Sequence, residues 1–187
     1  MLWKDFRKTD AKATSVQVLD DRVVALVESR KVLVIDDEHY TRKVIRTLLM
    51  TIGVRNIQEA ANGYAGLDAI RTFAPDIVLV DWSMPELDGP GFVRAVRSPE
   101  TFPHPDVPII MLTAHGERSR VIEAARLGVN EYLLKPVSSQ ALQARIVSVL
   151  AHPRKMVRRG DYYGPEPRKP SSFKPENDPG HTTLVLV

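Results

Sequence analysis

Acidic, hydroxyl and amine side chains stand where several apolar runs of this sequence end. Asp36 and Asp37 follow "VLVI", Asp81 ends "DIVLVD", Thr113 follows "IIML" and Lys135 follows "EYLL". Carboxylates held close together repel one another, and without a counter-charge the pKa of at least one should rise. A hard divalent cation such as Mg²⁺, which takes oxygen ligands and keeps several waters, offsets that repulsion. Together with a lysine and a hydroxyl, such a set suits phosphoryl transfer by positioning and charge stabilisation.

These residues can meet only if the chain between them folds into elements that bring the ends of the runs together. Short apolar runs indicate strands over 31–35, 76–81, 107–114 and 131–135, and "VRNIQEA" at 54–60 is a candidate second strand. Helical spacing of apolar residues indicates helices over 38–52, 63–74, 91–98, 118–128 and 138–152. This alternation predicts an α/β fold, a doubly wound five-stranded parallel sheet with helices on both faces. In such sheets ligands bind at the carboxyl ends of the strands, where the polar residues stand.

Composition places the chain among soluble globular proteins. Of its 187 residues 43% are hydrophobic and 26% charged. The absence of cysteine excludes disulfides and thiolate metal sites. No apolar run approaches the roughly 20 residues of a membrane span, and "MLWKDFRKTD" lacks the apolar core of a signal peptide. We therefore expect a cytoplasmic protein with no membrane span.

The flanks differ from the central segment 30–151. Residues 1–29 form an N-terminal extension that we expect to be partly helical, with Leu19, Val23, Leu26 and Val27 on one face. That face packs either on its own domain or on another protomer. Residues 152–187 are rich in proline and basic residues and are predicted to be a flexible tail.

The net charge of +3 resides in that tail, where seven basic residues face four acidic ones. This excess is modest beside the charge that a nucleic-acid footprint requires, so DNA binding is not expected. The stretch "RRGDYYGPEPRKP" resembles the basic, aromatic tails of some stand-alone bacterial receivers, and "TTLVLV" is β-prone and could add to a sheet edge.

Four motifs in order, "VLVIDDE", "DIVLVDWSMPELDGPGF", "IIMLTA" and "YLLKP", resemble those of the receiver domain of two-component response regulators. The resemblance covers residues 30–151. Each motif alone is weak, since an Asp pair after a strand is usually a surface turn or a helix cap. Together, each at a strand end, they are not a coincidence. The resemblance implies the flavodoxin-like (βα)5 receiver fold and a stand-alone receiver with N- and C-terminal extensions.

The resemblance also implies roles for particular residues around a Mg²⁺ cofactor. Asp81 resembles the phosphoacceptor. It would bind the metal together with Asp37 and the backbone carbonyl of Ser83, and Asp36 would act on the metal through water. Glu38 separates from these acids as a helix-start residue, where an acid favours the positive end of the helix dipole.

Further residues resemble those that respond to the phosphoryl group. Thr113 and Lys135 would bind its oxygens, and Tyr132, with Thr113, would form the switch. Ser83 and His115 would tune dephosphorylation; the alternative for His115 is a solvated loop residue. The Lys135-Pro136 peptide is expected to be cis.

The function that follows is signalling rather than conventional enzyme catalysis: the domain catalyses only its own phosphorylation and dephosphorylation. Its partners would be a histidine kinase or histidine phosphotransfer protein and a downstream protein target, with a homodimer left open. One alternative is a receiver-like scaffold or adaptor that works without phosphorylation. Another is a flavin or nucleotide binder, but it would need a Gly-rich phosphate cradle where this chain has Asp-Asp-Glu.

Overall fold

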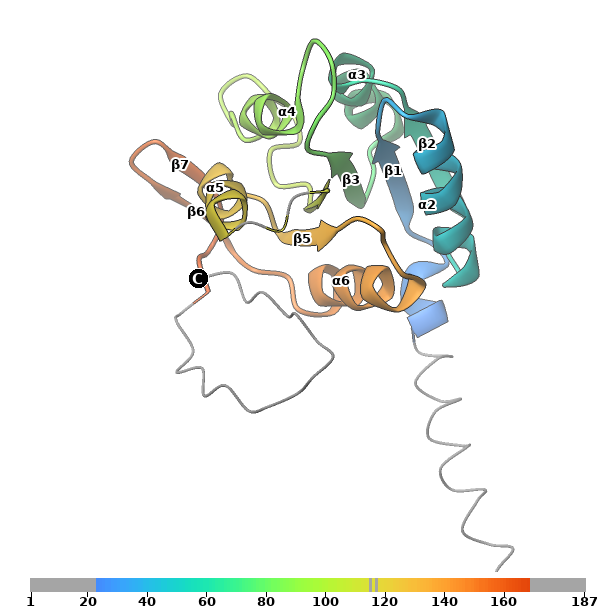
Figure 1. Cartoon of the computed structure of the whole chain (residues 1–187). Coiled ribbons are helices and arrows are strands. Elements are labelled where there is room, and N and C mark those ends of the chain that lie inside the picture. The colour runs from blue at the N-terminus through green and yellow to red at the C-terminus, as the bar shows by residue number, and fades with distance from the viewer. Residues whose placement is uncertain (1–22, 115, 117, 169–187) are drawn as a thin grey trace, which may run out of the picture.

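The computed structural model describes residues 23–168 apart from 115 and 117. Its centre is a parallel five-stranded sheet in the order β2-β1-β3-β4-β5 with helices on both faces (Figure 1). The strands are β1 Lys31–Ile35, β2 Asn56–Ala60, β3 Ile77–Asp81, β4 Ile109–Thr113 and β5 Glu131–Leu134. The helices are α2 His39–Thr51, α3 Gly63–Phe73, α4 Gly89–Val96, α5 Arg118–Leu127 and α6 Ser139–Ala151. The predicted doubly wound α/β architecture is confirmed.

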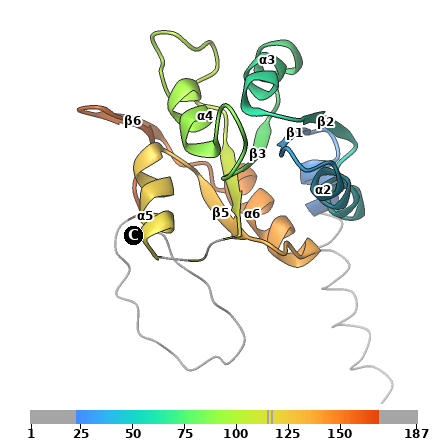
Figure 2. The same cartoon turned by 45° about the horizontal axis from the view of Figure 1, so that its top comes forward.

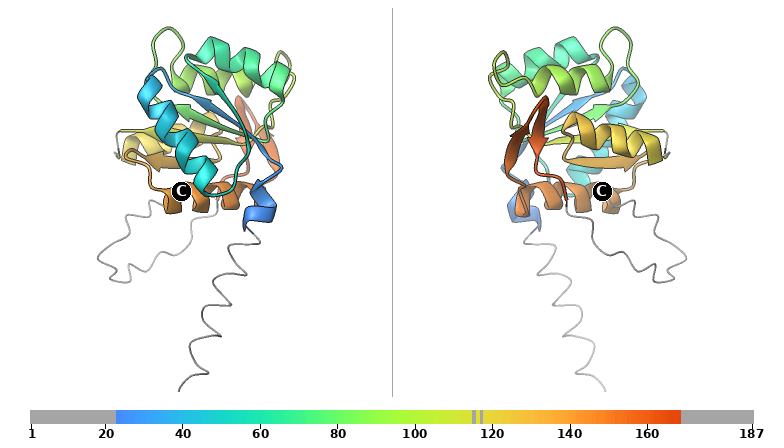
Figure 3. Two further views of the ribbon diagram at one scale, coloured as in Figure 1. Left: turned by 90° about the vertical axis from the view of Figure 1, so that its right-hand side faces the viewer. Right: turned by 90° about the vertical axis from the view of Figure 1, so that its left-hand side faces the viewer.

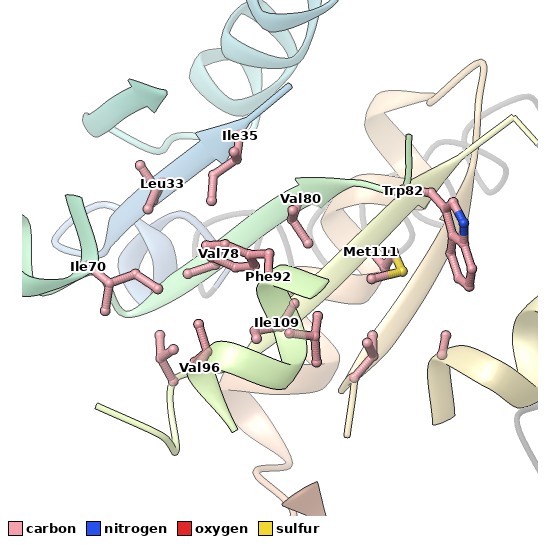
Figure 4. Packing of buried hydrophobic residues seen from close by; sticks show 14 of the residues in the cluster. Leu33, Ile35, Ile70, Val78, Val80, Trp82, Phe92, Val96, Ile109 and Met111 are labelled. Carbon is pink, nitrogen blue, oxygen red and sulfur yellow. The ribbon is translucent and has the colours of Figure 1, made fainter. Parts of the chain in front are cut away.

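Two apolar layers hold the helices on the sheet (Figure 2). Successive strand residues point to opposite faces, so Leu33 and Ile35 join the layer under α3, α4 and α5, with Phe92 at its centre (Figure 4). Val32 and Val34 join the opposite layer, under α2 and α6. Because both faces of β1, β3 and β4 are covered, these strands are nearly continuous apolar runs, the pattern that a buried parallel sheet requires.

Side chains with short polar groups begin three of the helices. Asn62 and Asp88 accept hydrogen bonds from backbone amides of α3 and α4, and Ser138 does the same for α6. Glu38 occupies the corresponding position of α2, as predicted. Its carboxylate, however, accepts a hydrogen bond from the Thr41 hydroxyl at 2.6 Å and caps no backbone amide.

The N-terminal extension enters the described structure at its last helical turns. Residues 23–27 are helical, and Val27 is completely buried beside α2 and α6. Val24 and Val27 pack against Gly53, which ends α2 with a φ of +101°. This part of the predicted apolar face therefore packs on its own domain, while Leu19 lies outside the described residues. None of the helices within residues 23–168 combines the length and apolarity needed to cross a membrane.

The prediction of a flexible tail from residue 152 is wrong for the first part of that segment. Strands β6 Met156–Arg159 and β7 Tyr162–Pro165 form an antiparallel hairpin that lies beside α5 (Figure 1). The composition argument considered only whether the tail could bury a core of its own. The hairpin instead relies on contacts with residues far away in the sequence.

Candidate functional site

The register of the sheet gathers the predicted residues on one rim. Ile35 pairs with Val80 across β1 and β3, and Asp81 pairs with Leu112 across β3 and β4. Thr113 in turn pairs with Leu134, the residue before Lys135. Parallel strands carry their carboxyl ends to the same edge, so residues widely separated in sequence become neighbours there.

Lys135 lies between two buried carboxylates. Its Nζ is 2.8 Å from Asp36 Oδ2 and 2.6 Å from Asp81 Oδ1. The Asp36 side chain is 1% exposed, that of Asp81 8%, and that of Lys135 24%. The ammonium group therefore offsets the repulsion between the Asp36 and Asp81 carboxylates. Because the Lys135 side chain is partly exposed, water still reaches it.

The titration of Asp81 and Lys135 follows from this arrangement. Burial raises the pKa of Asp81 above its ordinary 3.8, and the Asp36 charge adds to the rise, while Lys135 opposes it. Burial by itself would lower the pKa of Lys135, but the hydrogen bonds with Asp36 and Asp81 raise it overall. Lys135 therefore keeps its positive charge at neutral pH, whereas burial disfavours the charged form of Asp81.

Backbone groups fix the two carboxylates in place. The Glu38 amide donates to Asp36 Oδ1 at 2.9 Å, and the Ser83 amide donates to Asp81 Oδ2 at 3.0 Å. Gly89, the first residue of α4, stands so near β3 that a Cβ there would lie 2.4 Å from the Asp81 carbonyl oxygen. The "DGPGF" segment thus lets a helix begin directly against the end of β3.

The donor set suits Mg²⁺ in its chemistry, since carboxylate and carbonyl oxygens are the ligands that this ion prefers. In residues 23–168, 115 and 117 apart, no three His, Asp or Glu side chains stand together as a ready-made metal site. Asp37 is exposed on the rim, and Lys135 bridges Asp36 and Asp81. The ligand roles of Asp36, Asp37, Asp81 and Ser83 stay predictions.

Thr113, Tyr132 and Ser83, the described members of the remaining predicted residues, lie on or near the rim. Thr113 is fully buried at the end of β4, and Tyr132 is 7% exposed within the apolar layer under α5. Ser83 is exposed, and His115 lies outside the described residues. The Lys135-Pro136 peptide is cis, as expected.

Two arginines at this rim were missed by the sequence reasoning. Arg42 Nη1 donates to the backbone carbonyls of Asp36 at 2.7 Å and Asp37 at 3.2 Å, so it holds the loop after β1. The Arg120 guanidinium stacks on the ring of Trp82, the residue after Asp81, 4.8 Å from its centroid. The sequence contained one indication for Arg42, because it stands four residues after Glu38 and such residues are neighbours on a helix. It contained no indication for Arg120.

Known proteins share this fold and these motifs. Residues 32–147 match the family model of the response regulator receiver domain. The chain is 37% identical over 119 residues to the chemotaxis protein CheY of Pseudomonas aeruginosa, covering 64% of this chain and 94% of the relative. A crystallised CheY4 of Vibrio cholerae superposes with a TM-score of 0.59 at 29% identity, over 65% of this chain and 98% of that one. The receiver domain of the Francisella response regulator 1452 gives 0.60 at 30% identity, over 66% and 98%.

Proposed function

The chain belongs to the response regulator receiver domain family, and we propose that it accepts a phosphoryl group on Asp81 and thereby switches its binding to a protein partner. The observation that carries this proposal is the Asp81 carboxylate, buried at the strand rim and 2.6 Å from the Lys135 ammonium. A nucleophile and a fixed cation at that spacing suit a reaction governed by positioning and charge. The intact pair also speaks against a scaffold that works without phosphorylation.

The reaction is a transfer of one phosphoryl group. An Asp81 carboxylate oxygen attacks the phosphorus of a phosphohistidine on a histidine kinase or a histidine phosphotransfer protein. The P–N bond breaks, its electron pair stays on the imidazole nitrogen, and an acyl phosphate forms. Lys135 neutralises charge on the transferring oxygens, and the Thr113 hydroxyl donates to them. When bound by Asp37, Asp81 and the Ser83 carbonyl, Mg²⁺ supplies further charge neutralisation.

The output is a shift between two populated states. It can be no larger than the difference in the stabilisation that the phosphoryl group gives to each. Thr113 lies at the end of β4 and Tyr132 on the neighbouring β5, so movement of the hydroxyl toward the phosphoryl group changes the packing of the ring. Tyr132 is buried, with only 7% of its surface exposed. The switch therefore changes the packing of a buried ring, and this change alters the face around β5 and α5.

Chemical phosphorylation tests the proposal. The full-length protein is incubated with acetyl phosphate and Mg²⁺, and intact mass should show one phosphoryl adduct that hydroxylamine removes. Asp81→Asn should show none. A folded wild-type protein that acquires no adduct would contradict the proposal and favour the scaffold. A pull-down of wild type against Asp81→Asn under the same conditions then identifies the partner, and sedimentation identifies any homodimer.

The lifetime of the adduct tests the two tuning residues. Ser83 and His115 lie two positions beyond Asp81 and Thr113, where side chains can flank the path of the hydrolytic water. His115→Ala should change the phosphoryl half-life measured after acetyl phosphate is removed. An unchanged half-life would leave His115 as a solvated loop residue.

A further inference from the structure

Residues 153–168, called the strap from here on, cross the end of the sheet opposite the phosphoacceptor. The strap contains the β6–β7 hairpin and connects α6 with the last residue that the structure describes (Figure 3). Its receptor surface consists of the loop before β4, the carboxyl end of α5 and the start of β5. The strap is therefore an intramolecular ligand already seated on the receiver.

Polar contacts seat the strap at both of its ends and in its middle. Arg154 donates to the backbone carbonyl of Asn130 at the start of β5. The Tyr163 hydroxyl donates to Asp106 in the loop before β4. Arg168 pairs with Glu131, whose side chain is 3% exposed. These contacts explain why a segment without a core of its own takes one position.

The close approach of Gly128 and Gly164 determines the distance between the strap and the end of α5. A Cβ on Gly128, which ends α5 with a φ of +89°, would lie 2.6 Å from the Tyr163 carbonyl oxygen. A Cβ on Gly164 would lie 2.6 Å from the Gly128 Cα. Any displacement of the end of α5 by about one ångström therefore either breaks this contact or forces the strap away, since packed atoms tolerate little overlap.

The strap docks outside the two apolar layers, although Gly164 and Pro165 are buried. Within the described residues, neither apolar layer includes a strap side chain. The pair of Arg158 with Glu100 has both side chains more than half exposed, and such pairs contribute about 0–1 kcal/mol. Segments with few buried apolar contacts open at low free energy, so the strap can leave without unfolding the sheet.

Helix α5 and strand β5 each connect the strap with the phosphoacceptor rim. At the rim, Arg120 of α5 stacks on Trp82, the residue after Asp81, whereas at its other end α5 meets the strap through Gly128. Strand β5 begins at Glu131, the partner of Arg168, and ends just before Lys135, the partner of Asp81. Two elements thus contact both sites directly.

We propose that docking of the strap and phosphorylation of Asp81 oppose each other through α5 and β5, so that release of the strap is the first output of the receiver. The inference rests on the proposed phosphoacceptor function and names its first target, a segment of the same chain. The docked strap fits the arrangement in which Lys135 bridges Asp36 and Asp81. A phosphoryl group draws Lys135 to its own oxygens and repacks Thr113 and Tyr132, and the altered α5 and β5 fit the strap less well.

Coupling between two sites is reciprocal. If the phosphoryl group weakens docking, then loss of docking must favour the phosphorylated state by the same factor. Release would also uncover the carboxyl end of α5 and the start of β5, which then become available to a downstream protein. A purely structural brace would show neither effect.

Hydrogen exchange of the full-length protein tests the first half of this coupling. Protein treated with acetyl phosphate and Mg²⁺ is analysed by intact mass for the adduct and by peptide exchange for residues 156–165. Exchange there should accelerate about tenfold on phosphorylation, within the usual range of allosteric coupling. Asp81→Asn under the same treatment should show no change.

Gly164→Ala tests the second half, because its Cβ overlaps Gly128 while the receiver itself is unaltered. The control is Gly160→Asn at the tip of the hairpin, where a Cβ meets nothing within 4 Å and the φ of +60° suits asparagine. Gly164→Ala should exchange rapidly in the strap without phosphorylation and reach a higher phosphorylated fraction at limiting acetyl phosphate. Gly160→Asn should match wild type in both measurements.

The outcomes separate the two proposals. An adduct that forms without any change in strap exchange overturns the coupling and leaves the phosphoacceptor function intact. The absence of an adduct on folded wild-type protein overturns both. A Gly164→Ala strap that undocks while phosphorylation is unchanged also overturns the coupling, because reciprocity then fails.

Discussion

Lys135→Met removes the cation that bridges Asp36 and Asp81. At an effective dielectric constant of about 20, contacts of 2.8 and 2.6 Å correspond to about 6 kcal/mol of gross attraction each. Desolvation of the ammonium cancels most of that sum. Breaking a fully buried pair costs about 3–5 kcal/mol; because the Lys135 side chain is 24% exposed, we expect a net loss of about 2–3 kcal/mol.

Thermal unfolding without Mg²⁺ measures this loss. A change of that size should lower the Tm by roughly 5–10 °C in a protein of this length. Adding Asp81→Asn to Lys135→Met should restore at least half of the loss, because one of the two stranded carboxylates is then gone. Arg71→Met is the control: it breaks an exposed pair with Asp68 and a cation–π contact with the Phe102 ring, and it should change the free energy of unfolding by about 1 kcal/mol or less.

The pH dependence has a definite sign. Removing the lysine raises the pKa of Asp81 further above 3.8 than burial already does. A carboxyl group whose pKa is higher in the folded state than in the unfolded state destabilises the fold at pH values above that pKa. The deficit of Lys135→Met should therefore shrink as the pH falls from 7 toward the raised pKa of Asp81. A deficit that is constant over this range, or a Tm change at pH 7 below about 2 °C, would refute this account of the rim.

Two further predictions concern the framework of the receiver, at Arg97 on the end of the sheet opposite the rim and at Gly89 beside Asp81. Arg97→Met removes a guanidinium that stays charged at neutral pH, since burial lowers its pKa only to about 10, and that donates to the Gly128 carbonyl at 2.9 Å. Urea unfolding should show a loss of roughly 3 kcal/mol, whereas a loss below about 1 kcal/mol would show that the chain relaxes around the site. Gly89→Ala should cost about 2–4 kcal/mol and slow phosphorylation by acetyl phosphate, because its Cβ meets the Asp81 backbone. Gly66→Ala meets the movable Cδ1 of Ile35, so it should cost about 1 kcal/mol with an unchanged rate; equal effects of the two glycine substitutions would contradict the distinction.

The sequence predicts the sheet well because its signal is local. Runs such as Val32–Ile35 are apolar throughout, and the helices between them begin at residues such as Asn62 and Ser138, which cap backbone amides. Their alternation leaves few ways of arranging the strands. The identity of the rim residues followed, since each stands at a strand end.

The arrangement of charge within the rim was not predictable in the same way. The residues indicated that Lys135 would serve a phosphoryl group, whereas in the structure it bridges Asp36 and Asp81. Arg120 on Trp82 depends on how α5 lies over the sheet, which no local pattern encodes. The hairpin at Met156–Pro165 was missed for a related reason, because its partners Asp106 and Glu100 lie far away in the sequence.

The sheet and the strap are held by different kinds of contact, so ionic strength should affect them differently. Apolar layers hold the sheet and its helices, and added salt leaves such packing in place or strengthens it. The strap is held largely by hydrogen bonds and ion pairs, and the contacts of Arg158 with Glu100 and of Tyr163 with Asp106 are exposed. Charges in contact with water are screened over about 10 Å at 0.1 M salt, so rising salt loosens the strap while the receiver stays folded. The protein thus contains a segment whose attachment depends on the composition of the surrounding solution, independently of any kinase.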